Sequence, residues 1–182
     1  MAAAIEPIMV TQAVTQLEEL FRAHQVCVLK AAYRVTGSMA DAEDVSQSVF
    51  LRLARGAFDP GRISNMESYL RRSAVNAALD LIRSRGDRDI VPVETADEQQ
   101  SNSGVSPDRA VSSLEIKDWL RRQLATLNPR AAEMFALRYL EGLDNSEIAL
   151  TMNTSQAVVA VTLHRTRARL KKSLRAFRKG AS

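Results

Sequence analysis

Apolar residues recur at spacings of three and four along most of this chain, which is the period of an amphipathic α-helix. Between about Thr11 and Val35 the apolar stripe consists of Val14, Leu17, Phe21, Val28 and Ala32. A second stripe follows Gly37 and Ser38 and consists of Ala42, Val45, Val49 and Leu53. Gly37 is expected to end the first helix and Ser38 to cap the second. A third stripe, after a turn-rich loop, consists of Leu70, Ala74, Ala77, Ala78 and Leu81, and we expect Ser64 to cap this helix, with Glu67 as its capping-box partner.

The segment 87–106 interrupts this periodicity, because it is polar and acidic and shows no helical repeat. We interpret it as a flexible linker. Pro107 then opens a helix to about Thr126, and Asn128 with Pro129 opens another that leads to Glu141. Every periodic segment is therefore helical. The fold class is all-α, with two small helical domains at 12–86 and 107–176 joined by the linker.

Residues 144–170 read as a short helix, a tight turn and a longer helix. Asp144 and Glu147 form a capping box, and Asn153 stands at the turn, where a left-handed conformation is needed. Thr154 or Ser155 caps the second helix, whose apolar stripe is Val159, Leu163, Thr166 and Leu170. This pattern is typical of a helix-turn-helix whose second helix enters a DNA major groove. An ordinary helical hairpin is the alternative on this stretch alone.

The C-terminal end of the chain carries charge of one sign. The chain has a formal net charge of +4, but no acidic residue follows Glu147. The cations after it are Arg165, Arg167, Arg169, Lys171, Lys172, Arg175, Arg178 and Lys179. A field of one sign suits a polyanion, which favours the DNA-binding interpretation over a merely solvated tail. Cys27 is the only cysteine, and no apolar run is long enough to span a bilayer, so we expect a cytoplasmic protein without membrane insertion.

Two helices of the first half carry candidate binding groups. The second helix has a polar outer face of Asp41, Glu43, Asp44, Gln47 and Ser48. That face either serves the helix dipole or docks a basic partner. The third helix carries Tyr69, Arg71, Arg72, Asn76, Arg83 and Arg85, a set that suits single-stranded or distorted nucleic acid.

Catalytic and metal chemistry find little support in the sequence. His24 and Cys27 are half of a metal site without a second pair, so we expect no metal and no cofactor. A glycine-rich phosphate loop and a nucleophile-base pair are also missing from the sequence, so we expect no enzyme.

Taken together, these segments resemble the bacterial RNA polymerase sigma factors of the sigma-70 family, in particular the extracytoplasmic-function group. The stretch G-S-M-A-D-A-E-D-V-S-Q-S-V-F-L-R-L resembles the family's core-polymerase-binding helix. The stretch E-S-Y-L-R-R-S-A-V-N-A-A-L-D-L-I-R-S-R resembles its minus-ten promoter helix. L-N-P-R-A-A-E-M-F-A-L-R-Y-L-E-G-L-D-N-S-E-I-A resembles the opening of its sigma-four domain, so the resemblance covers roughly Leu17 to Leu174.

The resemblance implies a protein that binds core polymerase, directs it to promoters and assists melting. It assigns contacts with the clamp helices of the largest polymerase subunit to Asp41, Glu43, Asp44, Gln47 and Phe50. It assigns contacts with the melted minus-ten strand to Tyr69, Arg72, Asn76, Asp80 and Arg83, with help from the loop at 58–64. Contacts with the minus-thirty-five duplex fall to Ser155, Gln156, Ala160, His164, Arg165 and Arg167. An anti-sigma factor is a further partner that the resemblance allows.

The start of the recognition helix departs from the family pattern. The family usually has Gly-Thr-Val-Lys-Ser-Arg where this chain has the residues 157–162, A-V-V-A-V-T. The customary lysine and arginine are lost at Ala160 and Thr162, which removes donors for phosphates or base edges. Small apolar groups can still touch thymine methyls. Tyr69, where the family often has tryptophan, is a milder change that keeps a stacking ring.

Two alternatives remain at this point. One is a sigma-like interaction protein that binds an anti-sigma factor or core polymerase without reading promoters, which the altered recognition helix would explain. The other is a helix-turn-helix regulator that dimerises on a palindrome, which leaves the Asp41 to Leu53 match unexplained.

Overall fold

The computed structural model describes residues 6–55, 65–86 and 107–180, and these residues form helices without any strand. The helices are α1 (Glu6–Thr36), α2 (Met39–Ala54), α3 (Met66–Gly86), α4 (Pro107–Thr126), α5 (Pro129–Tyr139), α6 (Asn145–Thr151) and α7 (Gln156–Gly180). The prediction of an all-α fold is confirmed. The predicted linker at 87–106 and the loop at 58–64 lie outside the described residues, and the domain boundaries stay a prediction.

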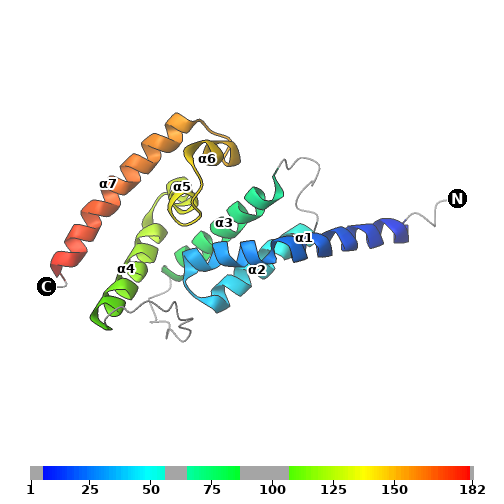
Figure 1. Cartoon of the computed structure of the whole chain (residues 1–182), viewed down its shortest axis with the longest axis horizontal. Coiled ribbons are helices and arrows are strands. Elements are labelled where there is room, and N and C mark those ends of the chain that lie inside the picture. Colours follow the sequence, from blue (N-terminus) through cyan, green and yellow to red (C-terminus); the bar gives the residue numbers. More distant parts are fainter. Residues whose placement is uncertain (1–5, 56–64, 87–106, 181–182) are drawn as a thin grey trace.

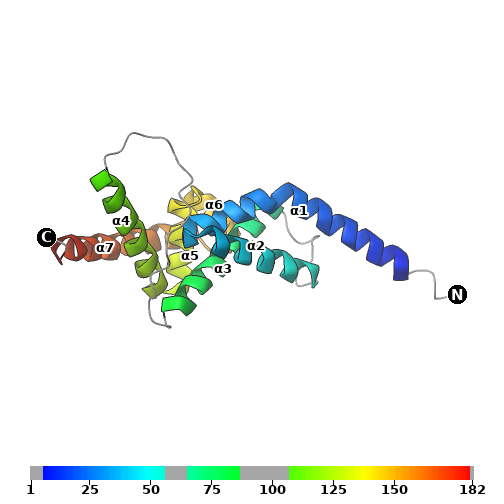
Figure 2. The same ribbon diagram turned by 90° about the horizontal axis from the view of Figure 1, so that it is seen from below.

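Helix α3 is the element that joins the two parts of the molecule. It packs against α1 and α2 on one side and against α4, α5 and α6 on the other. Figures 1 and 2 show it between the two groups of helices, with the start of α1 and the end of α7 at opposite ends of the molecule. Leu70 and Leu79 of α3 are almost completely buried, and one continuous core cluster includes residues of all seven helices. The two halves therefore meet across α3.

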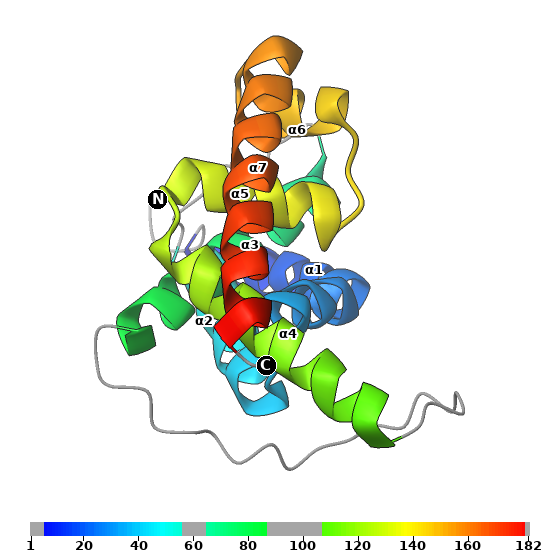
Figure 3. The same ribbon diagram turned by 90° about the vertical axis from the view of Figure 1, so that its left-hand side faces the viewer.

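The C-terminal half is built around α7. This helix packs on α5 and α6, and its far end lies beside α4, where Trp119 and Phe177 have ring centroids 6.2 Å apart (Figure 3). Ser173 of α7 donates a hydrogen bond of 2.8 Å to the side chain of Gln123 on α4. The predicted stripe of α7 is confirmed, because Val159, Leu163, Thr166 and Leu170 are all buried.

The helix ends follow from local side chains in most cases. The side chain of Ser38 accepts a hydrogen bond at the start of α2, and that of Asn128 does so at the start of α5, as predicted. Helix α3 differs from the expectation. Its first turn is capped by Asn65, whose side chain accepts a bond of 3.0 Å from the backbone N–H of Ser68. Ser64, the predicted cap, lies outside the described residues. Asn65 caps this helix instead.

Candidate nucleic-acid interface

The outer face of α2 carries most of the polar groups that the sequence assigns to polymerase. Glu43, Asp44 and Gln47 are exposed. Asp41 is placed differently from the expected outer face, because it is only 7% exposed and its two carboxylate oxygens accept hydrogen bonds of 2.5 and 2.6 Å from Arg85 of α3. Its charge is thus already neutralised inside the protein, at the junction of α2 and α3.

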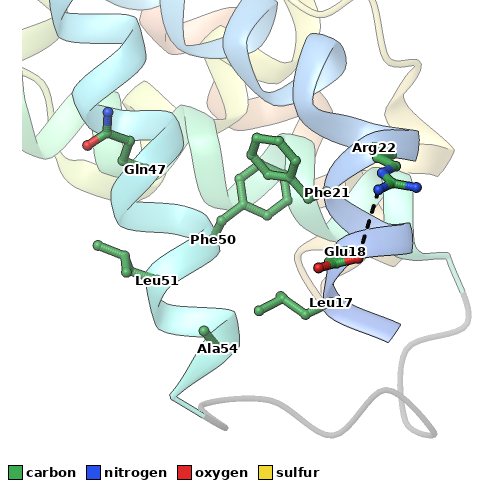
Figure 4. A pocket seen from close by; sticks show the side chains of 8 residues that line it. All are labelled: Leu17, Glu18, Phe21, Arg22, Gln47, Phe50, Leu51 and Ala54. Carbon is green, nitrogen blue, oxygen red and sulfur yellow. Dashed lines mark ion pairs between the residues drawn. The ribbon is translucent and has the colours of Figure 1, made fainter. Parts of the chain in front are cut away.

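An apolar groove lies beside these polar groups, between α1 and α2 (Figure 4). Its volume is about 590 Å³, and its lining consists of Leu17, Glu18, Phe21, Arg22, Gln47, Phe50, Leu51 and Ala54. Phe21 and Phe50 meet edge to face in it, with centroids 4.8 Å apart. Phe50 is nearly buried, whereas Leu51 is 54% exposed, so Leu51 offers more free apolar surface than the phenylalanine that the sequence singled out.

On α3 the predicted minus-ten residues Arg72 and Asn76 converge on a single carboxylate. Arg72 Nε donates to Glu133 Oε1 at 2.5 Å, and Asn76 Nδ2 donates to the same oxygen at 2.9 Å. Glu133 belongs to α5, and its side chain is only 10% exposed. Arg72 Nη1 also donates to the backbone oxygen of Thr151 at 2.6 Å, at the last residue of α6. The structure therefore brings Arg72 and Asn76 together, and their side-chain donors form hydrogen bonds with groups from the other half of the chain.

The remaining minus-ten candidates lie elsewhere on α3. Asp80 is exposed and pairs with Arg83 at 3.0 Å, one helical turn apart. Arg83 also has a buried Nε and Nη2 for which the described residues supply no hydrogen-bond acceptor. Tyr69 is half-buried and packs against the core. The Asp80–Arg83 pair is separate from the hydrogen bonds that Arg72 and Asn76 make to Glu133.

A second charged contact between the halves lies around Glu141. Arg34 of α1 donates to Glu141 Oε2 at 2.9 Å, and Arg71 Nε lies 3.6 Å from the same oxygen. The Glu141 side chain is 1% exposed. Burial lowers the pKa of Arg71, but its neighbours Cys27, Glu141 and Glu67 outweigh burial and leave that pKa raised, so Arg71 stays charged.

The helix-turn-helix has the predicted local geometry. Asp144 accepts bonds from the backbone N–H groups of Ser146 and Glu147, and Glu147 accepts from the backbone of Asp144 at 2.7 Å, which completes the capping box. Asn153 has a positive φ of 47° at the turn, as predicted. Ser155, one of the two predicted caps, accepts from the backbone N–H of Val158 at 3.3 Å at the start of α7. Hydrogen bonds from the Ser146 hydroxyl and from the backbone of Glu147 lower the pKa of Asp144.

The outward face of α7 is open. All the residues assigned to the minus-thirty-five duplex are exposed, namely Ser155, Gln156, Ala160, His164, Arg165 and Arg167. Val158 and Val161, which the assignment left out, are 46% and 49% exposed. The apolar groups occupy the first two turns, and the cations begin at Arg165. In helix-turn-helix proteins it is the N-terminal part of the recognition helix that contacts base edges.

The sequence alone did not identify two acids that make contacts between the halves. They are Glu133 of α5 and Glu141, which follows the end of α5. Glu133 stands in the apolar run A-A-E-M-F-A-L, and a lone acid among buried positions signals an internal partner. That partner could not be identified from spacing, because Arg72 and Asn76 are 61 and 57 residues away. Among the described residues no group of three or more His, Cys, Asp or Glu side chains is placed to hold a metal ion. None of the described helices is both long and apolar enough to cross a membrane.

Comparison with known proteins gives two family matches in chain order. Residues 20–88 match the model of sigma-70 region 2, and residues 117–170 match that of sigma-70 region 4. The chain is 31% identical to the ECF RNA polymerase sigma factor SigE of Mycolicibacterium smegmatis, over 85% of this chain and 60% of SigE. It is 29% identical to the ECF RNA polymerase sigma factor SigW of Bacillus subtilis, over 81% of this chain and 83% of SigW.

A solved structure shares the fold. CnrH, in complex with the cytosolic domain of CnrY, superposes with a TM-score of 0.55 at 23% sequence identity, over 93% of this chain and 96% of that chain. The chain therefore spans nearly all of CnrH and most of SigW, but about three fifths of SigE.

Proposed function

Because the chain belongs to the extracytoplasmic-function group of the sigma-70 family, we propose that it directs RNA polymerase core to specific promoters and assists DNA melting. The observation that carries this proposal is the pairing of two matched regions in one chain. Region 2 supplies an acidic helix and an arginine helix, and region 4 supplies a capped helix-turn-helix with an open, basic face.

We assign the polymerase contact to the exposed groups of α2 and the adjoining groove. Glu43, Asp44 and Gln47 offer acceptors to basic side chains, and Leu51 offers apolar surface at the groove. Electrostatic groups of this kind set the rate and specificity of association, while the apolar contact contributes affinity. Asp41 would act through the position of α2, because its carboxylate is held by Arg85.

We assign the minus-thirty-five duplex to the outward face of α7 and the melted minus-ten strand to the polar face of α3. The cations after Glu147 neutralise phosphates without reading sequence, and the first turns of α7 lie against the bases. On α3, Arg72 and Asn76 supply donors for a phosphate or an unstacked base. These roles need binding energy alone, so we propose that the protein has no catalytic activity of its own and acts with polymerase in the cytoplasm.

We also propose a protein partner that holds the chain inactive. Support comes from the likeness to CnrH, which was solved with the cytosolic domain of CnrY. The alternative of an interaction protein that never reads promoters is not favoured, because the similar proteins are themselves RNA polymerase sigma factors.

The test is transcription with purified components. The full chain is added to core polymerase from the same bacterium, and initiation is mapped on a library of its genomic fragments. We expect a set of start sites that share elements near minus ten and minus thirty-five and depend on the added protein. Tight binding to core polymerase with no start site above that of core alone would refute the proposal. A variant with Asn76→Ala should lose melting, read by permanganate reactivity, more than duplex binding.

A further inference from the structure

Arg72 and Asn76 form an anion site on α3, and that site is filled from within the molecule. The Glu133 carboxylate of α5 receives both donors, and the Thr151 carbonyl at the end of α6 receives a third bond from Arg72. A carboxylate and a phosphate present the same kind of oxygen to a guanidinium. Glu133 therefore stands where a phosphate of the minus-ten strand would stand if it met the same donors.

We propose that Glu133 competes with promoter DNA for Arg72 and Asn76, and that the free protein is held closed by this contact. The inference rests on the proposed function, since it assumes that α3 binds the minus-ten strand. In the closed arrangement α5 and α6 cover the donors of α3. Strand binding then requires the two halves to separate.

The net free energy of the Glu133 contact suits a reversible switch better than a permanent stabilising contact. A buried ion pair loses much of its Coulombic gain to desolvation, so it adds little net stability as long as it is intact. Exchange of the Glu133 carboxylate for a DNA phosphate leaves Arg72 and Asn76 satisfied, so the donors lose nothing when the halves open onto DNA. Loss of the Glu133 charge within the closed arrangement is unfavourable, because Arg72 is then held against α5 without a counter-charge.

A second contact supports closure at a different place. Arg34 of α1 reaches across to Glu141, in the short segment between α5 and α6. The Arg34 side chain is 47% exposed, and the sequence assigns it no DNA or polymerase contact. Substitution of Arg34 therefore affects only the closed arrangement. It tests closure separately from the DNA-binding donors.

Three variants of the full chain test the proposal. Glu133→Gln keeps the shape of the side chain and removes its charge, and Arg34→Ala weakens closure without touching α3. Glu115→Gln is the matched control, because Glu115 is an exposed acid of α4 and its substitution changes net charge by the same amount. The probe is a fluorescein-labelled single strand with the minus-ten sequence that the transcription assay identifies. Binding is measured by anisotropy without polymerase.

We expect Glu133→Gln to tighten strand binding by about tenfold, because the apparent affinity rises with the population of the competent state. Arg34→Ala should tighten it in the same direction despite removing a positive charge, and Glu115→Gln should change it by less than about twofold. Equal effects of Glu133→Gln and Glu115→Gln would show that only net charge matters and would overturn the proposal. So would weaker binding by Arg34→Ala.

Small-angle scattering of the same variants separates this inference from the proposed function. Glu133→Gln and Arg34→Ala should increase the radius of gyration, while Glu115→Gln should leave it at the wild-type value. An unchanged radius in both variants would refute closure by these contacts, whatever the DNA data. Larger radii together with no strand binding by any form would leave closure standing and count against the role of α3 in DNA binding.

Discussion

Two valines at the start of α7 lead to a prediction about how the minus-thirty-five element is read. Val158 and Val161 are half-exposed on the free face of the recognition helix, next to Ala157 and Ala160, whose side chains offer no hydrogen-bond donors to base edges. In the major groove the C5 methyl of thymine is the apolar feature of the base pairs. We therefore expect replacement of thymine by uracil, which removes that methyl alone, to weaken binding of the duplex.

The expected magnitude follows from the exposed area of these side chains. Both valines retain about half of their surface for contact, at 46% and 49% exposure, so each has room to bury one methyl. A buried methyl or methylene contributes about 0.8 kcal/mol, which corresponds to roughly a fourfold loss of affinity for each contacted thymine that becomes uracil. Two such contacts give a loss of about fifteenfold if they are independent. Contacts through side-chain donors would show no such dependence.

The assay is fluorescence anisotropy of the full chain with a minus-thirty-five duplex in which thymines are replaced one at a time. In Val161→Ala the uracil effect should fall at one position and persist at the others, because the partner of that methyl is gone. Val26→Ala is the matched control, since Val26 is 56% exposed on α1 and loses the same atoms away from the recognition helix. Equal affinities of the thymine and uracil duplexes for the wild-type chain would refute methyl readout.

Three further outcomes can be measured on the purified chain. Gly37→Ala and Gly142→Ala both place a side chain at positive φ, at a cost of about 1–2 kcal/mol, and their Tm losses should be similar, because the added Cβ at Gly37 would meet only the end of the flexible Arg121 side chain and nothing lies within 4 Å at Gly142; a much larger loss at Gly37 would show that Arg121 cannot move aside. Leu51→Glu should weaken binding to core polymerase by about tenfold, whereas Val26→Glu should leave it within about twofold, and similar losses would exclude the groove as the contact. The lowered pKa of Asp144 means that its contribution to stability is present above the ordinary aspartate pKa of about 4 and is lost as pH falls through the lowered value, so the Tm difference between wild type and Asp144→Asn should be constant near neutral pH and shrink only in acid; a difference that does not depend on pH would contradict the charged cap.

The sequence predicted those parts of the fold that depend on neighbouring residues. Caps act over three or four positions, so Ser38, Asn128 and Asp144 could be read directly. The recognition helix was equally clear, because its buried stripe repeats with the helical period. Contacts between distant segments could not be read in this way. Asp41 has the sequence context of an exposed helix-start acid, and only the packing of α2 on α3 brings Arg85 to it.

The same limit applies to the candidate site. Arg72 and Asn76 could be selected as nucleic-acid donors from their types and from the family resemblance, but their state depends on where α5 lies. No residue near Glu133 in the sequence indicates that Glu133 pairs with Arg72 and Asn76. That these assigned residues contact DNA stays a prediction. The packing of the two halves adds that Arg72 and Asn76 are bound to Glu133 in this arrangement.

The two DNA surfaces differ in that availability, and the difference implies an order of events. The outward face of α7 is exposed in the closed arrangement, so the proposed duplex contact at minus thirty-five would need no rearrangement. The donors of α3 are bound to Glu133 and Thr151, so the proposed contact with the minus-ten strand would have to wait until α5 and α6 move away. Because Thr151 ends the first helix of the helix-turn-helix, any partner that pulls this unit from α3 also breaks the Arg72 contact. Polymerase that binds the two halves apart would thereby couple its own binding to release of the α3 donors that are proposed to hold the minus-ten strand.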